Sequence, residues 1–219
     1  MTIKAVLFDW DGTLYDIFDF VVHTYSQVMR EKGIREWSRQ EYREKFRIDW
    51  RETLKDMGLE EHEEYLIQVW EKNMGEMRDD LTLHEDAKET ITKLSEKYVV
   101  GVVSAAPRKA LLKEVKRLGV KEHIRIIVSK NDTDETKPSP KPLFYAAEKL
   151  KFKPEECIYV GDMIEDVLAA KRAGMKSVAV SWGLHSKTRL KTENPDYMAD
   201  SFAQIRDRLF FGRHHRWKE

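Results

Sequence analysis

The sequence predicts an α/β protein with a doubly wound parallel sheet and a helical segment inserted after the first strand. Five short runs are apolar throughout and rich in β-branched residues, as in strands that are buried on both faces of a parallel sheet. Amphipathic stretches with helical spacing separate most of these runs. One long segment near the N-terminus interrupts this alternation and has helical periodicity alone.

Strands and helices are predicted in alternation along most of the chain. The predicted strands are Ala5–Phe8, Tyr98–Val103, Ile124–Val128, Ile158–Val160 and Ser177–Val180. The predicted helices are Asp86–Lys97, Arg108–Leu118, Pro142–Leu150 and Met163–Ala173. The last of these helices is followed by Gly174, which is typical of a helix end.

The segment of residues 15–80 differs from the rest of the chain. It contains no proline and no convincing strand run, and its apolar residues recur at helical spacing from Phe18 to Met29 and from Tyr65 to Trp70. We therefore predict an α/β core domain formed by residues 1–14 and 81–219, and a helical domain formed by residues 15–80. The polar, basic tail of residues 212–219 is predicted to fray, and its His214 and His215 to be tail residues rather than ligands.

Composition limits the classes of protein to which the chain can belong. Of the 219 residues 36% are charged, and the 39 basic and 39 acidic residues cancel, so no basic footprint for nucleic acid is expected. The single cysteine, Cys157, excludes an intrachain disulfide and is predicted to be a core residue. No signal peptide or membrane-spanning run is found, so a soluble, cytoplasmic protein is expected. The Lys- and Glu-rich surface with few Asn and Gln favours a thermophilic source.

Two carboxylates follow the first predicted strand, in the segment Asp9-Trp10-Asp11-Gly12-Thr13. Side chains at i and i+2 of an extended chain point the same way. One carboxylate could therefore attack phosphorus while the other handles the proton of the leaving group. Gly12 lets the backbone turn sharply. The alternative is an ordinary Asp-Gly turn with a helix cap.

A hydroxyl and a lysine follow further along the chain. Ser104 comes directly after the second predicted strand, and its hydroxyl and the next amide, of Ala105, could hold a phosphoryl oxygen. Alternatively Ser104 caps the helix that starts near Pro107. Lys137 lies in a proline-rich segment and could balance the charge of a carboxylate and a phosphate. The alternatives are a solvated lysine, or Lys141 in the same role.

Two further acids, Asp162 and Asp166, follow the fourth predicted strand. At i and i+4 of a helix start they would lie on one face. Their oxygens suit Mg²⁺, which usually takes one or two carboxylates together with substrate phosphate. The alternative is that they only stabilise the first turn of the helix.

Each of these motifs lies at the end of a predicted strand, where ligands bind in open α/β sheets. On these motifs, and in this order, the chain resembles the haloacid dehalogenase superfamily, and within it the phosphoglycolate-phosphatase-like branch. The resemblance covers essentially the whole chain; it is strongest over residues 6–16 and 137–184 and weakest over the helical segment. It implies a Rossmann-like core, with the helical segment as a cap domain that closes over the site.

The resemblance also implies roles for single residues. Asp9 attacks phosphorus and forms an aspartyl-phosphate, while Asp11 protonates the leaving oxygen and then activates water. Mg²⁺ is held by Asp9, the backbone carbonyl of Asp11 and Asp162. Asp166 supports the metal or Lys137 from a second layer of contacts.

For the substrate, the resemblance implies a small phosphorylated metabolite bound at its phosphoryl group by Ser104 and Lys137. Many relatives have Asn where this chain has Ala105, so a contact to substrate is lost there or supplied elsewhere. The implied partner set contains no nucleic acid and no membrane, and the chain is expected to be a monomer or a small homo-oligomer.

The implied function is a Mg²⁺-dependent phosphatase acting on a small phosphate monoester. Dehalogenases and phosphonatases generally lack a carboxylate at the position of Asp11, which disfavours both. The catalytic histidine of the phosphomutases would fall at Val21, with His23 the nearest imidazole. The alternatives are a phosphomutase of the same family, or a catalytically weak protein that binds a phospho-ligand or regulates a partner.

A row of basic residues recurs every four positions in the predicted cap: Arg35, Arg39, Arg43, Arg47, Arg51 and Lys55. On one helix, adjacent members would be neighbours and could receive a second acidic group of the substrate. The favoured interpretation is a solvated helix face with nearby glutamates as counter-charges.

Overall fold

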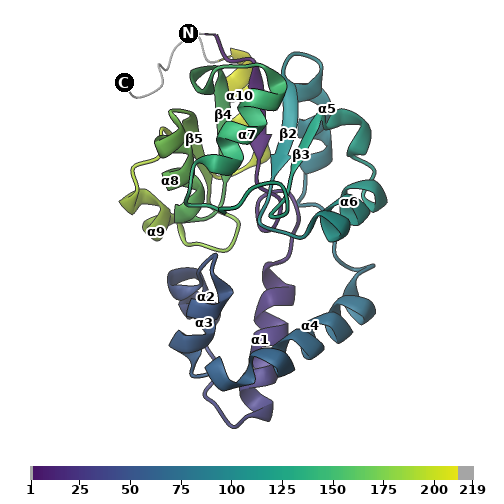
Figure 1. Ribbon diagram of the computed structural model, residues 1–219, viewed down its shortest axis with the longest axis vertical. Helices are drawn as coiled ribbons and strands as arrows, with labels where there is room; N and C mark the ends of the chain where they lie inside the picture. The colour runs from purple at the N-terminus through teal and green to yellow at the C-terminus, as the bar shows by residue number, and fades with distance from the viewer. Residues whose placement is uncertain (1, 212–219) are drawn as a thin grey trace.

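The computed structural model describes residues 2–211, and a six-stranded sheet with only parallel pairings forms its centre (Figure 1). The strand order is β3-β2-β1-β4-β5-β6. The strands are β1 (Ala5–Phe8), β2 (Val99–Val103), β3 (Ile126–Val128), β4 (Cys157–Gly161), β5 (Lys176–Val180) and β6 (Tyr197–Ala199). The α/β class with a doubly wound parallel sheet is thus confirmed. The prediction for the tail, with His214 and His215, lies outside the described residues.

Helices cover both faces of the sheet. They are α5 (Ala87–Ser95), α6 (Arg108–Arg117), α7 (Lys141–Leu150), α8 (Ile164–Ala173), α9 (Lys187–Thr192) and α10 (Phe202–Phe211). Val6 and Phe8 of β1 pack in the apolar cluster that includes α5 and α6, whereas Ala5 and Leu7 pack in the cluster that includes α7 and α8. This alternation follows from the two-residue period of a strand, and burial of both faces explains the continuous apolar runs.

The sheet differs from the prediction in one strand, β6, which the sequence analysis missed. It has three residues, lies at the edge of the sheet and pairs with β5 alone. Tyr197 and Met198 are only partly buried, so the segment has no continuous apolar run. Cys157 heads β4 with no exposed surface, which confirms it as a core residue, and burial raises the pKa of its thiol to about 11.

Between β1 and α5 the described chain is helical. It contains α1 (Phe18–Glu31), α2 (Arg39–Lys45), α3 (Trp50–Met57), the short 3₁₀ turn η1 (Glu60–His62) and α4 (Glu63–Met77). Figure 1 shows these helices as a lobe below the sheet, where α1 and α4 pack against each other. Its role as a cap domain with the boundaries 15 and 80 stays a prediction.

The basic row of this lobe, Arg35 to Lys55, does not lie on one helix. Its members would be regular neighbours only on a single continuous helix. Ser38 accepts from the amide of Glu41 at the start of α2, and Asp49 accepts from the amide of Arg51 at the start of α3. Because Ser and Asp are strong N-caps, the chain forms two short helices with non-helical residues between Lys45 and Trp50. Most of the row is paired with acids: Arg35 with Glu41, Arg39 with Asp19, Arg47 with Glu52 and Asp56, Arg51 with Glu63.

Among residues 2–211, no helix has both the length and the apolar character needed to cross a membrane.

Candidate active site

The predicted site residues meet at the carboxyl edge of the sheet. Asp9 directly follows β1, and its amide donates to the carbonyl of Val160 on β4 at 2.8 Å. Asp162 follows β4, and Ser104 follows β2. In the order β3-β2-β1-β4, the chain winds away in opposite directions from β1 and β4, and such a switch point is where open α/β sheets bind ligands.

Lys137 lies at the centre of this group, 3% exposed, in the loop between β3 and α7. Its Nζ is 2.7 Å from Asp9 Oδ1, 2.6 Å from Asp166 Oδ1 and 2.9 Å from the hydroxyl of Tyr159. Burial alone would lower the pKa of Lys137, but Asp166 and Asp9 raise it well above its ordinary value. The ammonium is therefore charged at neutral pH and faces Asp9 directly.

Lys141, the alternative to Lys137, lies at the surface. Its Nζ is 2.9 Å from Asp134 Oδ2 and 2.5 Å from Glu135 Oε1, and its side chain is 45% exposed. It contacts exposed loop acids, not the carboxylates at the sheet edge. The sequence left open which of the two lysines faces these carboxylates, and the structure shows that it is Lys137.

Asp162 is fully buried and its two oxygens are held from two sides. Thr13 Oγ1 donates to Oδ1 at 2.6 Å, and the amide of Leu184 donates to Oδ2 at 2.7 Å. The backbone of Gly12 and of Gly183 packs against this carboxylate so closely that a Cβ at either position would lie 2.3 Å from Oδ2. Because Gly12 also has φ +82°, it is the residue type that this turn requires.

Asp166 is placed differently from the prediction. The helix α8 begins at Ile164, after Met163 in an extended conformation, so Asp162 lies outside the helix and the two acids do not share a helix face. Asp166 lies in the first turn, where Oδ2 accepts from the amide of Met163 at 2.9 Å and Oδ1 accepts from Lys137. One carboxylate thus stabilises the helix start and holds the lysine.

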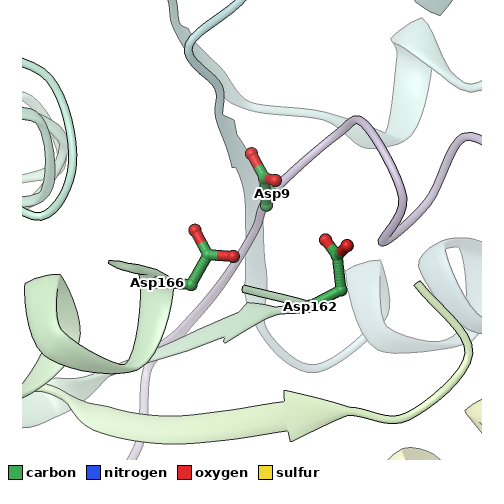
Figure 2. Close-up of side chains that lie close together, drawn as sticks. All are labelled: Asp9, Asp162 and Asp166. Carbon is green, nitrogen blue, oxygen red and sulfur yellow. The ribbon is translucent and has the colours of Figure 1, made fainter. Parts of the chain in front are cut away.

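Asp9, Asp162 and Asp166 form a buried carboxylate group, in which one oxygen of each lies within 4.8 Å of the others (Figure 2). Burial raises the pKa of Asp9 well above its ordinary value, against the effect of Lys137. Burial and Asp166 raise the pKa of Asp162 to about 7. A single ammonium does not balance three buried carboxylates, so either protons or a cation must complete the site.

A divalent cation fits the donor chemistry of this group. Lys137 binds Oδ1 of Asp9 and leaves Oδ2 for another partner. The oxygens of Asp162 are oriented by fixed donors, as is usual for metal ligands, and each still has a lone pair. Carboxylate oxygens are the donors that Mg²⁺ prefers. Asp166 differs from Asp162 because its Oδ1 already faces the positive charge of Lys137 at 2.6 Å, while its Oδ2 accepts from the amide of Met163, so it is better suited to hold the lysine.

The carboxylate of Asp11 lies outside this group, as expected for a residue predicted to contact the metal through its backbone carbonyl and to act through its carboxyl as acid and base. It is half-buried in the turn after β1. Burial raises its pKa to about 6, with Lys137 lowering it and Glu114 raising it. An acid with this pKa can both give and take a proton near neutral pH.

Ser104 is 5% exposed, and its Oγ accepts from the amide of Ala106 at 3.0 Å. The N-cap of α6 is Pro107, so Ser104 does not cap this helix as the alternative required. A small cavity of about 10 Å³ adjoins Ser104, Ala105 and Lys137, which is room for about one water-sized group. The hydroxyl and the lysine therefore reach one common space.

The helical lobe contacts the core next to Asp162. Arg43 donates to the carbonyl of Gly183, and its guanidinium lies 4.1 Å from the ring centre of Phe18. His185 accepts from the amide of Ile164 through Nδ1 at 3.0 Å, so its Nε2 donates to the carbonyl of Phe46 at 2.8 Å. Unlike most of its row, Arg43 thus faces the core and not a carboxylate partner.

Four residues of the site were missed or given no role by sequence reasoning: Thr13, Tyr159, Gly183 and His185. Thr13 and Gly183 lay within segments that were noted for their motifs, but their contacts to Asp162 come from chain segments far apart in sequence. Tyr159 lay in an apolar run and was counted as part of a strand. No local signal distinguishes a tyrosine that binds a lysine from one that only fills a core.

Known proteins resemble this chain over most of its length. Residues 6–180 match the family model described as haloacid dehalogenase-like hydrolase. Pyrophosphatase PpaX of Bacillus mycoides is 28% identical over 207 residues, which span 94% of this chain and 96% of that protein. PpaX of Bacillus anthracis is 28% identical over 206 residues, which span 94% and 95%.

Two solved structures share the fold. One is a predicted phosphoglycolate phosphatase from Haemophilus somnus, with TM-score 0.77, 22% identity, and coverage of 94% of this chain and 98% of that one. The other is a haloacid dehalogenase-like family hydrolase from Streptococcus pneumoniae, with TM-score 0.80, 20% identity, and coverage of 93% and 96%. At these identities the likeness shows the fold alone.

Proposed function

Because this chain belongs to the haloacid dehalogenase-like hydrolases, we propose that it is a Mg²⁺-dependent phosphatase that hydrolyses a small phosphate monoester through an aspartyl-phosphate on Asp9. One observation supports this most directly. Asp9 lies at the end of β1, 2.7 Å from the buried ammonium of Lys137 and beside Asp162 in a carboxylate group that suits a divalent cation. A carboxylate nucleophile, a fixed positive charge and a cation site are the parts that phosphoryl transfer needs.

In the proposed reaction, an oxygen of Asp9 attacks phosphorus, and the bond to the leaving oxygen breaks as Asp11 gives that oxygen its proton. The ionised Asp11 then takes a proton from the water that attacks the aspartyl-phosphate, which releases phosphate and restores both carboxyl groups. The pKa of about 6 suits Asp11 for both steps.

Other residues bind and orient the phosphoryl group in this proposal. Lys137 balances its charge, and Ser104 with the amide of Ala105 holds an oxygen. Asp9, the backbone carbonyl of Asp11 and Asp162 would hold Mg²⁺, which supplies positive charge that offsets the phosphate oxygens.

The substrate is proposed to be a small phosphorylated metabolite. The names of the relatives make pyrophosphate and phosphoglycolate the first compounds to test. No observation favours a phosphomutase, because Val21 is buried and His23 is exposed on α1. The cytoplasmic location, the monomeric or small homo-oligomeric state and the thermophilic source stay predictions.

The test is hydrolysis of p-nitrophenyl phosphate with Mg²⁺. Asp9→Asn should lower kcat at least about a thousandfold, because the amide cannot act as the nucleophile, and EDTA should abolish the activity. Asp134→Asn, at an exposed loop position, is the matched control and should keep activity within about twofold of wild type. Full activity of Asp9→Asn, or activity that EDTA does not affect, would contradict the proposal. Phosphate binding without turnover by the wild type would favour the regulatory alternative.

A further inference from the structure

A buried tyrosine inside the sheet reaches the active-site lysine. Tyr159 lies on β4 and is 1% exposed. Its hydroxyl is 2.8 Å from the carbonyl oxygen of Val103 and 2.9 Å from Nζ of Lys137. A phenol has one proton to donate. The carbonyl of Val103 at 2.8 Å is a much closer acceptor than Oδ1 of Asp166 at 3.5 Å, and the ammonium is itself a donor. The bond to Val103 therefore turns the lone pairs of the hydroxyl toward Lys137.

Lys137 uses all of its donors in this arrangement. An ammonium has three N–H groups and no acceptor, and here they reach Asp9 Oδ1, Asp166 Oδ1 and the hydroxyl of Tyr159. Two contacts alone would leave the ammonium free to swing about the line that joins the two carboxylates. The third contact fixes its place, which matters because a lysine side chain is a point charge on a flexible stem.

The third partner is also neutral, and this affects the charge of the site. A third carboxylate beside Lys137 would compete with a phosphoryl group for the ammonium and add a further buried negative charge. A phenol accepts a hydrogen bond without either consequence. Burial raises the pKa of Tyr159 well above its ordinary value, so the hydroxyl is protonated at neutral pH.

We propose that Tyr159 is a positioning residue for phosphoryl transfer, whose hydroxyl holds the ammonium of Lys137 in place against Asp9. The inference rests on the proposed function, because the placement of Lys137 affects the rate only if a phosphoryl group is transferred to Asp9. Tyr159 does not line the cavity beside Ser104, and its hydroxyl bonds to Val103 and Lys137; it acts through the lysine.

The first test is Tyr159→Phe, which removes one oxygen and keeps the ring. With p-nitrophenyl phosphate and Mg²⁺, kcat should fall about tenfold, the effect of losing one hydrogen bond to a charged group, and KM should change by less than about twofold. Tyr42→Phe is the matched control. Tyr42 is equally buried, but its hydroxyl contacts the neutral Ser26 at 3.2 Å, so kcat should stay within about twofold.

The decisive measurement is the same substitution in a Lys137→Met background. If Tyr159 acts through Lys137, adding Tyr159→Phe to Lys137→Met causes no further loss of kcat. A general structural effect would lower kcat by the same factor in both backgrounds. An unchanged kcat of Tyr159→Phe, or an equal loss in the two backgrounds, overturns the inference.

Two further arms complete the experiment. If Tyr159→Phe does not fold, 3-fluorotyrosine at position 159 keeps the hydroxyl but weakens it as an acceptor. The loss of kcat should then be smaller than tenfold, and it should be absent in the Lys137→Met background. Asp9→Asn is measured in parallel. Retained activity in Asp9→Asn overturns the proposed function and this inference together. If Asp9→Asn loses activity but Tyr159→Phe keeps the wild-type kcat, the inference about Tyr159 is overturned and the proposed function is not.

Discussion

Thr13→Val should raise the Mg²⁺ concentration needed for half-maximal activity. Thr13 has no exposed surface, and its hydroxyl donates to Oδ1 of the fully buried Asp162 at 2.6 Å. Valine has the same shape without the hydroxyl, so the substitution removes one oriented hydrogen bond to a charged group, worth about 1.5–3 kcal/mol. The amide of Leu184 still holds Oδ2 at 2.7 Å, which places the expected effect at the low end. We expect a roughly 10- to 30-fold higher Mg²⁺ requirement.

The assay is p-nitrophenyl phosphate hydrolysis titrated with Mg²⁺ in metal-free buffer. Thr24→Val is the matched control, because Thr24 is equally buried but accepts from the neutral Asn73 at 3.2 Å, within the helical lobe. Its Mg²⁺ requirement should match wild type. A folded Thr13→Val protein with a wild-type Mg²⁺ requirement would refute the view that Asp162 must be oriented to hold the metal.

Three further outcomes are expected. Gly183→Ala should lower kcat at least about tenfold, because the new Cβ would lie 2.3 Å from Asp162 Oδ2 and displace the carboxylate. Lys141→Ala should leave kcat/KM within about twofold, because this lysine contacts exposed loop acids only. His185→Gln should alter the pH dependence of stability. Burial and Arg189 lower the pKa of His185 to about 3, against roughly 6.5 when unfolded, so its contribution is complete above pH 6.5 and declines as pH falls toward 3.

Each of these outcomes has its own check. Gly58→Ala is the control for Gly183→Ala, since a Cβ there meets no atom within 4 Å; the positive φ of Gly58 costs stability and not activity. A tenfold loss of kcat/KM in Lys141→Ala would contradict the assignment of Lys137, rather than Lys141, as the lysine of the active site. For His185, the free energy of unfolding is measured with urea at pH 7 and pH 5. The advantage of wild type over His185→Gln should shrink by about 2 kcal/mol, and a constant difference would contradict the assignment.

Much of the core could be predicted because its signals are local. Five of the six strands were found from runs such as Ala5–Phe8, since a strand buried on both faces must be apolar at every position. The edge strand β6 was not predicted, because its partly buried residues do not need to be apolar at every position. The favoured interpretation of the basic row, a solvated surface with acidic counter-charges, agrees with its exposed ion pairs. The row does not lie on one helix, because the N-caps Ser38 and Asp49 divide it between two helices.

The sequence by itself determined that an acid pair, a hydroxyl and a second acid pair follow strand ends, with a lysine in the segment after the third strand. Because the strands are parallel, their carboxyl ends meet at one edge, so Asp9, Asp162 and Asp166, with Lys137 or Lys141, were candidates for one site without coordinates. Only the tertiary structure decided that Lys137, not Lys141, is buried against Asp9, and that Asp166 holds the lysine from the first turn of α8.

The structure alone also supplied Tyr159 and Thr13 as partners of these charges. The physical reason is the range of the interactions. Strand and helix patterns depend on neighbours within a few residues, whereas the bond from Thr13 to Asp162 joins positions 149 residues apart. A buried charge needs partners in space, and the sequence does not state which distant residue will be there.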